Sequence, residues 1–319
     1  MKVGLYSITY LGLWYDGPAL SLRDLIARAG EHGYEGIEID GKRPHGNPGD
    51  WPDARCRELR ERAEDAGIEI YAVAANNDFS SPIPEHREAQ LAYVRDLIRM
   101  TAALGAPVMR VFAAWPGVTR SGGVGRYDVA RRVWHEAHSE SLSQETWDRC
   151  RDGLIEAARR AGEEGVTLAL QNHPPVIENY HDLLRMIWEV DSPRLMACLD
   201  APLLARQGQK DMREAVFATG ALQVLSHFGG EYDQPPGGAA RSWVRQPDGA
   251  LVPEDFYAAF VAALRDTGYR GYLGYELCHP LPVLGDRTVG IEFADRNARL
   301  AAEYMRGLIA GARAAPDPA

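Results

Sequence analysis

Four side chains that can bind a metal ion stand at the ends of short apolar segments in the second half of the chain. Gln171 ends TLALQ, Asp200 ends LMACLD, His227 ends the segment that begins at Ala221, and Glu276 ends GYLGYE. Carboxylate and amide oxygens together with an imidazole nitrogen suit manganese, magnesium, cobalt or zinc. One such residue alone is more often a hydrogen-bonded strand end, but four at equivalent positions predict one divalent metal ion.

Strand alternation indicates where these side chains point. In residues 167–173, Leu168 and Leu170 share one face, and Gln171 lies on the other face with His173. Successive side chains of a strand point to opposite sides, so the apolar set predicts the helix-facing side and the polar set the inside of a barrel. The polar strand ends are therefore expected to meet at one rim.

Three further residues are candidates for binding a substrate. Glu38 lies in GIEID, Arg110 lies in the segment that begins at Val108, and Trp115 follows that segment. They could hydrogen-bond to hydroxyl groups or stack on a ring face. For Arg110, a buried ion pair with Glu38 is an equal alternative.

The elements that must position these residues alternate between short β-branched or apolar runs and longer segments with helical spacing. We expect eight strands and eight helices, which predicts a single-domain α/β fold, a (β/α)8 TIM barrel. The expected strands cover residues 3–7, 36–40, 68–75, 108–114, 167–173, 195–200, 221–227 and 271–276. Expected helices cover residues 21–33, 52–67, 85–104, 143–165, 180–190 and 288–310, and one more is opened by Pro253. Long loops follow the fourth, seventh and eighth strands, where barrels of this kind build their sites.

Composition excludes several classes of protein. The 319 residues carry 35 basic and 45 acidic side chains, a net charge of −10 without a basic cluster, so nucleic acid is not an expected partner. We also expect no membrane association, because no apolar stretch approaches the roughly 18 residues of a membrane span. Four scattered cysteines indicate a cytoplasmic location. The barrel is expected to cover residues 1–314, and residues 315–319 to form a flexible tail.

The segments TLALQNH, MACLDA, LSHFGGE and YLGYELC, together with GYEGIEID, resemble the sugar phosphate isomerase/epimerase superfamily of xylose-isomerase-like barrels. The resemblance covers essentially the whole chain. It implies a sugar or sugar derivative as substrate, a homo-oligomer, and one metal ion, most often manganese, held by Gln171, Asp200, His227 and Glu276. It further implies that Glu276 is a catalytic base.

Gln171 departs from the family pattern, which has Glu at the end of the fifth strand. In the epimerases of the family, this Glu and the one after the eighth strand exchange a proton with the substrate from both sides. A Gln can ligate through its amide oxygen, but it cannot act as a base. His173 is the nearest replacement, either as a second base or as a binding residue. The change also removes one negative charge, which indicates either a retuned metal site or a lost one.

The leading hypothesis is a metal-dependent isomerase or epimerase that removes a proton beside a carbonyl of a sugar, keto-sugar or cyclitol through an enediolate. A lyase or dehydratase with the same chemistry, for example one that cleaves a 3-keto glycoside, is the first alternative. A non-catalytic sugar-binding barrel is the second. An endonuclease-like relative would need about three metals and a basic groove, and neither is present.

Overall fold

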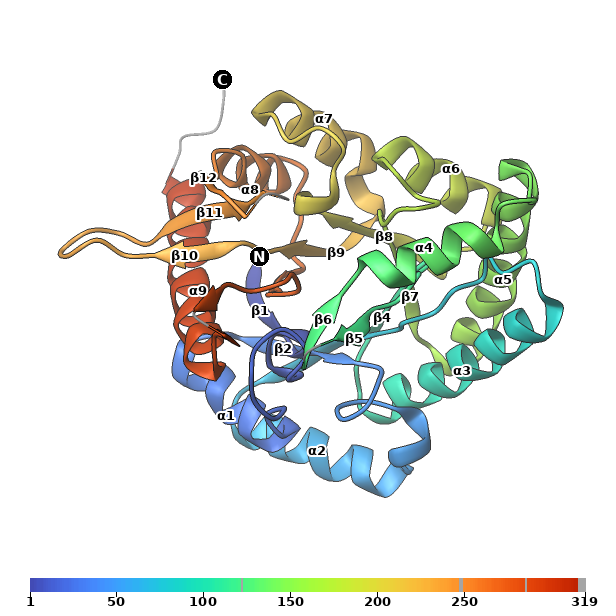
Figure 1. Cartoon of the computed structure of the whole chain (residues 1–319), viewed down its shortest axis with the longest axis horizontal. Helices are drawn as coiled ribbons and strands as arrows, with labels where there is room; N and C mark the ends of the chain where they lie inside the picture. Colours follow the sequence, from blue (N-terminus) through green and yellow to red (C-terminus); the bar gives the residue numbers. More distant parts are fainter. Residues whose placement is uncertain (122, 247–248, 285, 315–319) are drawn as a thin grey trace.

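Eight parallel strands close into a barrel in the computed structural model of the chain (Figure 1). The structure describes residues 1–121, 123–246, 249–284 and 286–314. Around the barrel the strands follow each other in chain order, and the last pairs with the first. They are β1 (Lys2–Tyr6), β2 (Gly36–Asp40), β3 (Glu69–Ala74), β4 (Val108–Val111), β7 (Thr167–Gln171), β8 (Leu195–Asp200), β9 (Gln223–Phe228) and β13 (Tyr272–Tyr275). The predicted TIM barrel is confirmed.

Helices surround the barrel and begin and end largely where the sequence signals them. They are α1 (Leu22–His32), α2 (Asp53–Asp65), α3 (Pro84–Ala103), α5 (Ser143–Glu164), α6 (Tyr180–Val190), α7 (Gln209–Thr219), α8 (Tyr257–Asp266) and α9 (Ile291–Ala314). At α1, the Ser21 side chain accepts a hydrogen bond from the Asp24 amide, and Gly33 ends the helix with φ 77°. These are the usual signals for starting and stopping a helix.

Extra elements occupy the loops at the carboxyl ends of the strands. After β4 come the hairpin β5 (Thr119–Ser121) and β6 (Val124–Arg126) and the helix α4 (Asp128–Ala137). After β9 comes a three-stranded sheet of β10 (Glu231–Asp233), β11 (Arg241–Arg245) and β12 (Leu251–Pro253), which projects from the barrel in Figure 1. The short strands β14 (Val283–Leu284) and β15 (Arg287–Thr288) follow β13.

Two expectations about helices need correction. Pro253 does not open a helix, because it ends β12 and pairs with Trp243 of β11, and α8 begins at Tyr257. The terminal helix begins at Ile291 rather than near residue 288. Helix α7, which connects β8 to β9, is the eighth expected helix, for which no residue range was predicted.

Two separate apolar clusters confirm the predicted faces of the strands. Leu168 and Leu170 belong to the large cluster between strands and helices, whereas Ala169 and Cys198 belong to a small cluster inside the barrel. Gln171 follows Ala169 by two residues and therefore shares its inward face.

Tyr71 fills the inside of the barrel from β3. A Cβ atom at Gly4 would come within 2.3 Å of the Tyr71 ring, and one at Gly274 within 2.7 Å of its hydroxyl oxygen. The Tyr71 ring also stacks on Tyr272, with the ring centroids 4.0 Å apart. Glycine at these strand positions therefore makes room for the ring that closes the barrel interior.

Two further predictions concern membrane association and the C-terminal tail. Among the helices of the described ranges, none is both long enough and apolar enough to cross a membrane. The predicted tail, residues 315–319, lies outside the described residues, and the 1–314 boundary stays a prediction.

Candidate active site

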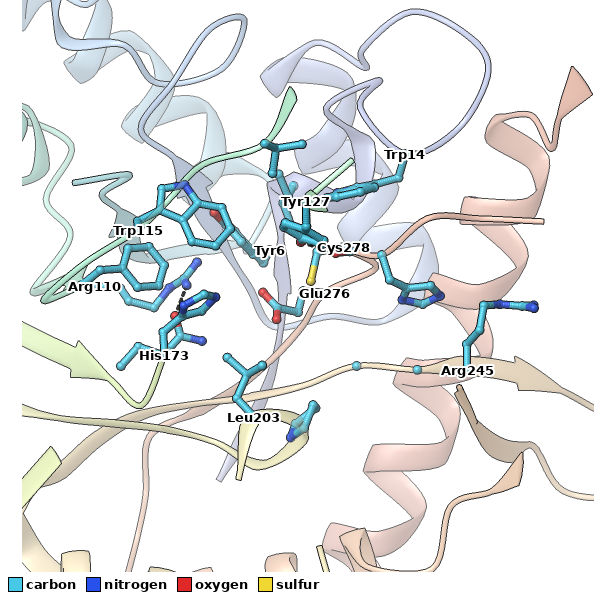
Figure 2. Close-up of a pocket in the computed structure, with 18 of the residues that line it drawn as sticks. Tyr6, Trp14, Arg110, Trp115, Tyr127, His173, Leu203, Arg245, Glu276 and Cys278 are labelled. Atoms are coloured by element: carbon cyan, nitrogen blue, oxygen red, sulfur yellow. Dashed lines mark hydrogen bonds between the residues drawn. The ribbon is translucent and has the colours of Figure 1, made fainter. Parts of the chain in front are cut away.

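A cavity of about 330 Å³ opens at the carboxyl ends of the strands. Among the described residues, its walls carry seven Phe, Trp or Tyr side chains, Tyr6, Trp14, Phe112, Trp115, Tyr127, Phe256 and Tyr257. Its polar lining includes Lys42, Asn76, Arg110, Gln171, His173 and Glu276. Figure 2 shows Glu276 pointing into this space, opposite His173, Arg110 and Trp115. Apolar walls with a few converging polar groups are typical of small-molecule sites.

The predicted metal ligands lie at this end of the barrel but not on one surface. Gln171 and Glu276 line the cavity, while Asp200 and His227 are fully buried and are not among its lining residues. Asp200 and His227 are neighbours in the ladder between β8 and β9, and His227 pairs with Gly274 of β13. The expected convergence of these strand ends is therefore present.

Arg110 connects these strand ends across the barrel. Its Nε donates to Glu38 Oε1 at 2.7 Å, and its Nη1 donates to Gln171 Oε1. Gln171 in turn donates from Nε2 to Asp200 Oδ2 at 2.5 Å. The Arg110 side chain is only 3% exposed, and Glu38 is buried below the cavity rather than lining it. The alternative of a buried ion pair between Arg110 and Glu38 is thus observed.

His227 also bonds to Glu38. Its Nε2 lies 2.6 Å from Glu38 Oε2, and its Nδ1 lies 3.9 Å from Cys198 Sγ. Burial alone would lower the pKa of His227, but the Glu38 carboxylate raises it well above the ordinary histidine value. Burial alone would raise the pKa of Glu38, but Arg110 and His227 lower it to about 2. Both results follow from opposite charges held together away from water.

On the side of the site formed by Asp200 and Glu276, negative charge is less compensated by positive groups. Burial, and then the negative charge of Glu276, raise the pKa of Asp200 to about 7. Asp200 Oδ1 is buried without a hydrogen-bond partner among the described residues. The Asn172 amide holds the Asp200 backbone, since it donates to the carbonyl at 3.1 Å and accepts from the amide at 2.7 Å.

As arranged, the donor atoms do not fit a complete metal site. Gln171 Oε1 is used by Arg110 and His227 Nε2 by Glu38, so Asp200 Oδ1 and the Glu276 carboxylate are the remaining oxygens. Within the described ranges, no three His, Cys, Asp or Glu side chains converge as a group that could hold a metal ion. Catalytic metal sites usually have three or more protein ligands. Binding through all four residues would require His227 to leave Glu38 and Gln171 to leave Arg110.

His173 lines the cavity as a neutral imidazole. Its Nδ1 lies 2.5 Å from the Pro174 carbonyl oxygen. Because a carbonyl oxygen only accepts, Nδ1 carries the proton and Nε2 keeps its lone pair. Burial lowers the pKa of His173 to about 3, and the rings of Phe112 and Trp115 pack against it edge-on with centroids 5.0 and 4.7 Å away. This geometry favours a hydrogen-bond acceptor over a proton carrier.

Some lining residues were not anticipated from the sequence. Tyr6 lies under the Arg110 guanidinium, whose Cζ is 4.6 Å from the ring centroid, and its hydroxyl donates to Asp40 at 2.6 Å. Tyr127 comes from the loop after β4, donates to the Cys278 carbonyl, and lines the cavity. Tyr6 is the last residue of β1 and Tyr127 lies in the loop before α4, and neither residue type by itself indicates a functional site.

At the rim, Glu231 joins two loops. It accepts from Arg245 Nη2 at 2.7 Å, and its Oε1 lies 3.1 Å from His279 Nε2. Glu231 is in β10 and His279 follows β13, so this cluster fixes the projecting sheet to the last loop of the barrel.

A family model described as a xylose isomerase-like TIM barrel matches residues 26–307. Among solved structures, the chain is similar to D-psicose 3-epimerase from Clostridium cellulolyticum H10, crystallised with D-tagatose. The TM-score is 0.70 and the identity 17%, over 97% of this chain and 99% of that one.

Two other solved structures are similar over comparable lengths. For 3-keto-D-glucoside 4-epimerase from E. coli, the TM-score is 0.66 and the identity 18%, over 96% of this chain and 99% of that one. For L-ribulose 3-epimerase, the TM-score is 0.67 and the identity 18%, over 100% of this chain and 99% of that one. At these identities the structural likeness shows a common fold.

Proposed function

The chain belongs to the xylose isomerase-like TIM barrel family, and on this premise we propose that it is an isomerase or epimerase of a sugar, keto-sugar or cyclitol. Glu276 removes the proton from the carbon beside the substrate carbonyl. The proton then returns to the neighbouring carbon in an isomerisation, or to the same carbon on its other face in an epimerisation. The sugar epimerases among the structural neighbours support this class of substrate.

One observation carries the proposal: the Glu276 carboxylate reaches a cavity whose other walls are aromatic rings and hydrogen-bonding groups. Phe112 stacks on Trp115 with the ring centroids 5.3 Å apart, so we assign the C–H face of the sugar to the Trp115 ring and a sugar hydroxyl to His173 Nε2. A carboxylate beside an enclosed C–H bond is positioned for general-base catalysis.

Among the described residues, Glu276 supplies the one carboxylate on the cavity wall, which favours proton transfer on one face of the substrate. An epimerisation reverses the configuration at one carbon, so it needs a proton carrier on each face. Gln171 cannot be the second carrier, and the low pKa of His173, about 3, makes that imidazole a weak one. Transfer between neighbouring carbons on one face needs Glu276 as its one carbon base, while the hydroxyl proton of the substrate moves from one of its two oxygens to the other.

The same geometry supports a lyase as a second candidate. If the enediolate expels a substituent from the next carbon, one base is again sufficient, as in cleavage of a 3-keto glycoside. In a non-catalytic sugar-binding barrel, the third candidate, Glu276 would only accept hydrogen bonds from sugar hydroxyls.

The metal ion that the family resemblance implies stays an untested prediction, and proton removal by Glu276 is proposed independently of it. Manganese is the first choice, with magnesium, cobalt or zinc as alternatives, and a bound ion would supply a Lewis acid for the carbonyl oxygen. Because Gln171 Oε1 and His227 Nε2 are hydrogen-bonded to Arg110 and Glu38, the proposed proton transfer uses only side chains of the protein. A cytoplasmic location and a homo-oligomeric state also stay predictions.

The proposal is tested by incubating the protein in deuterated water with ketoses, keto-glycosides and inososes, with and without added Mn²⁺, and following each C–H signal by proton NMR. An isomerase or epimerase gives a deuterium-labelled isomer, and a lyase gives an unsaturated or cleaved product. If sugars bind but no compound exchanges a proton or is converted into another compound, the binding-barrel alternative is correct and the proposal fails.

A further inference from the structure

The guanidinium of Arg110 has one nitrogen that the protein leaves unused. Nε is held by Glu38 and Nη1 by Gln171, whereas Nη2 is buried and has no hydrogen-bond partner among the residues that the structure describes. A buried donor without a partner is costly, so such a group in a cavity wall indicates a ligand that supplies the missing acceptor.

We infer that Arg110 is the resident cation of this site and that its Nη2 binds the carbonyl oxygen of the sugar, which becomes negative in the enediolate. The inference rests on the proposed function and deepens it. Nη2 would donate a charged hydrogen bond to that oxygen while Glu276 takes the proton from the adjacent carbon. Fixed donors aimed at developing negative charge are among the strongest contributions to catalysis.

The surroundings hold the guanidinium in a single orientation. Its Cζ lies 4.6 Å from the Tyr6 ring centroid and 5.3 Å from that of Phe112, and its other two nitrogens are bonded to side chains of β2 and β7. Such a donor does not reorient when charge develops, which is the condition for preorganised stabilisation.

The identity of residue 171 follows from the same arrangement. Gln171 accepts from Arg110 through its oxygen and donates to Asp200 through its nitrogen. A carboxylate at this position could accept from Arg110 but would face the Asp200 carboxylate without a proton to donate. A site whose cation is the Arg110 guanidinium therefore favours an amide at position 171.

Arg110 also explains why the predicted ligands are engaged. It binds one Glu38 oxygen and leaves the other to His227 Nε2, and it occupies Gln171 Oε1. A divalent ion bound among His227, Gln171 and Asp200 would have to displace these bonds beside an existing positive charge.

The test uses protein dialysed against EDTA and the variants Arg110→Gln, Arg110→Lys and Glu38→Gln/Arg110→Gln. The double variant removes both charges of the pair, so no buried carboxylate loses its partner. Arg57→Gln, an exposed change on α2, is the matched control. Circular dichroism and thermal melting establish that each variant is folded.

Two measurements are made on each protein: the rate of deuterium exchange into the active compound, and Mn²⁺ binding followed by EPR titration. We expect EDTA-treated wild-type protein to retain exchange, and Arg110→Gln and the double variant to lose roughly 10²–10³ in kcat, the usual effect of removing one oxyanion donor. Arg110→Lys keeps the positive charge but not the planar set of N–H donors, so its rate should lie between the rates of wild type and Arg110→Gln. The double variant should bind Mn²⁺ more tightly than wild type, because His227 and Gln171 are released. Arg57→Gln should match wild type in both measurements.

Loss of wild-type exchange on EDTA treatment, with recovery at one equivalent of Mn²⁺, would overturn the inference and leave the proposed function intact. Full exchange activity in folded Arg110→Gln would overturn it as well. If no compound exchanges with any form of the protein, the proposed function fails. The Mn²⁺ titration then decides by itself whether Arg110 is the resident cation: equal binding in wild type and double variant rejects it, and tighter binding in the double variant supports it.

Discussion

Gln171 determines how charge is distributed at the barrel end, because it joins a cation to a carboxylate. Its amide oxygen faces Arg110 and its amide nitrogen faces Asp200. Replacing the amide nitrogen of Gln171 by an oxygen, as in Gln171→Glu, turns its attractive contact with Asp200 into a repulsive one and changes the side-chain volume very little.

Gln171→Glu should therefore tighten Mn²⁺ binding and slow the native reaction. The new carboxylate repels Asp200 unless a cation or a proton lies between them, and it adds one negative charge where the enediolate forms. It also adds a second base, so any epimerisation should rise relative to the native reaction. EPR titration with Mn²⁺ and product analysis by NMR measure these changes.

Gln144→Glu, an exposed change on α5, is the control for this variant. Unchanged metal affinity, rate and product distribution in Gln171→Glu would mean that residue 171 contacts neither a metal nor the reacting atoms.

His173 is expected to bind substrate rather than carry a proton. His173→Phe keeps a ring against Trp115 but removes the Nε2 acceptor, so KM should rise by up to about 10-fold, the value of one hydrogen bond, with a smaller change in kcat. Steady-state kinetics separate the two parameters. A large fall in kcat at constant KM would instead identify His173 as the missing second base.

At the residue scale, the sequence predicted the strand ends but not the side-chain partners. Gln171, Asp200, His227 and Glu276 were found because strand period and chain order determine where they lie. The bond between His227 and Glu38 joins residues 189 positions apart, and nothing local distinguishes it from metal ligation. That choice depends on the Arg110 side chain, which reaches across the barrel from β4.

Among the elements, the contact between β9 and β13 positions His227. A Cβ atom at Gly274 would lie 2.7 Å from His227 Cδ2 and 2.7 Å from the Tyr71 hydroxyl. Both neighbours belong to buried side chains. The glycine in YLGYE is thus a packing requirement of the two strands.

Gly274→Ala should destabilise the fold by about 1–3 kcal/mol, as overpacking of a core usually does, and should also reduce turnover by moving His227. Gly307→Ala is the control, since nothing lies within 4 Å of a Cβ atom at that exposed position of α9. Urea unfolding compares the two variants. If Gly274→Ala is as stable as wild type, the barrel interior is looser than described.

The cluster around Glu231 should make the attachment of the projecting sheet depend on pH. Burial alone would raise the pKa of Glu231, but His279 and Arg245 lower it to about 2. A carboxylate with a lowered folded-state pKa stabilises the fold above its unfolded pKa of roughly 4.3, and this contribution disappears as the pH falls through the folded value.

Glu231→Gln should accordingly be less stable than wild type at pH 7, and the difference should shrink between about pH 5 and pH 2. Urea midpoints measured at each pH give the comparison. A difference that stays constant from pH 7 to pH 3 would rule out an ionised Glu231 as its source.

Secondary structure was predictable where apolar periodicity and capping residues agreed. Strands β2 and β8 have the expected bounds, as does helix α6. The prediction of a helix at Pro253 was wrong because proline is common both at the start of a helix and at a sheet edge. Here Pro253 ends the edge strand β12. Local sequence does not distinguish these two roles.

At the scale of the whole molecule, the residues that stabilise the barrel are separate from the residues that line the cavity. The apolar clusters lie between the strands and helices and inside the barrel, while the cavity is built at the carboxyl ends with loops that carry Trp14, Trp115 and Tyr127. This division allows one family to place different polar groups on the same frame. The Arg110 network is such a variation.

Proton transfer by the Glu276 carboxylate is measured by the rate at which Glu276→Gln exchanges deuterium into the active compound. The amide keeps the shape of the side chain but cannot accept the proton, so exchange should fall by roughly 10²–10⁴. Glu178→Gln, the same change at an exposed position after β7, should leave the rate unchanged. Exchange at the wild-type rate in folded Glu276→Gln would show that Glu276 is not the base and that the base lies elsewhere.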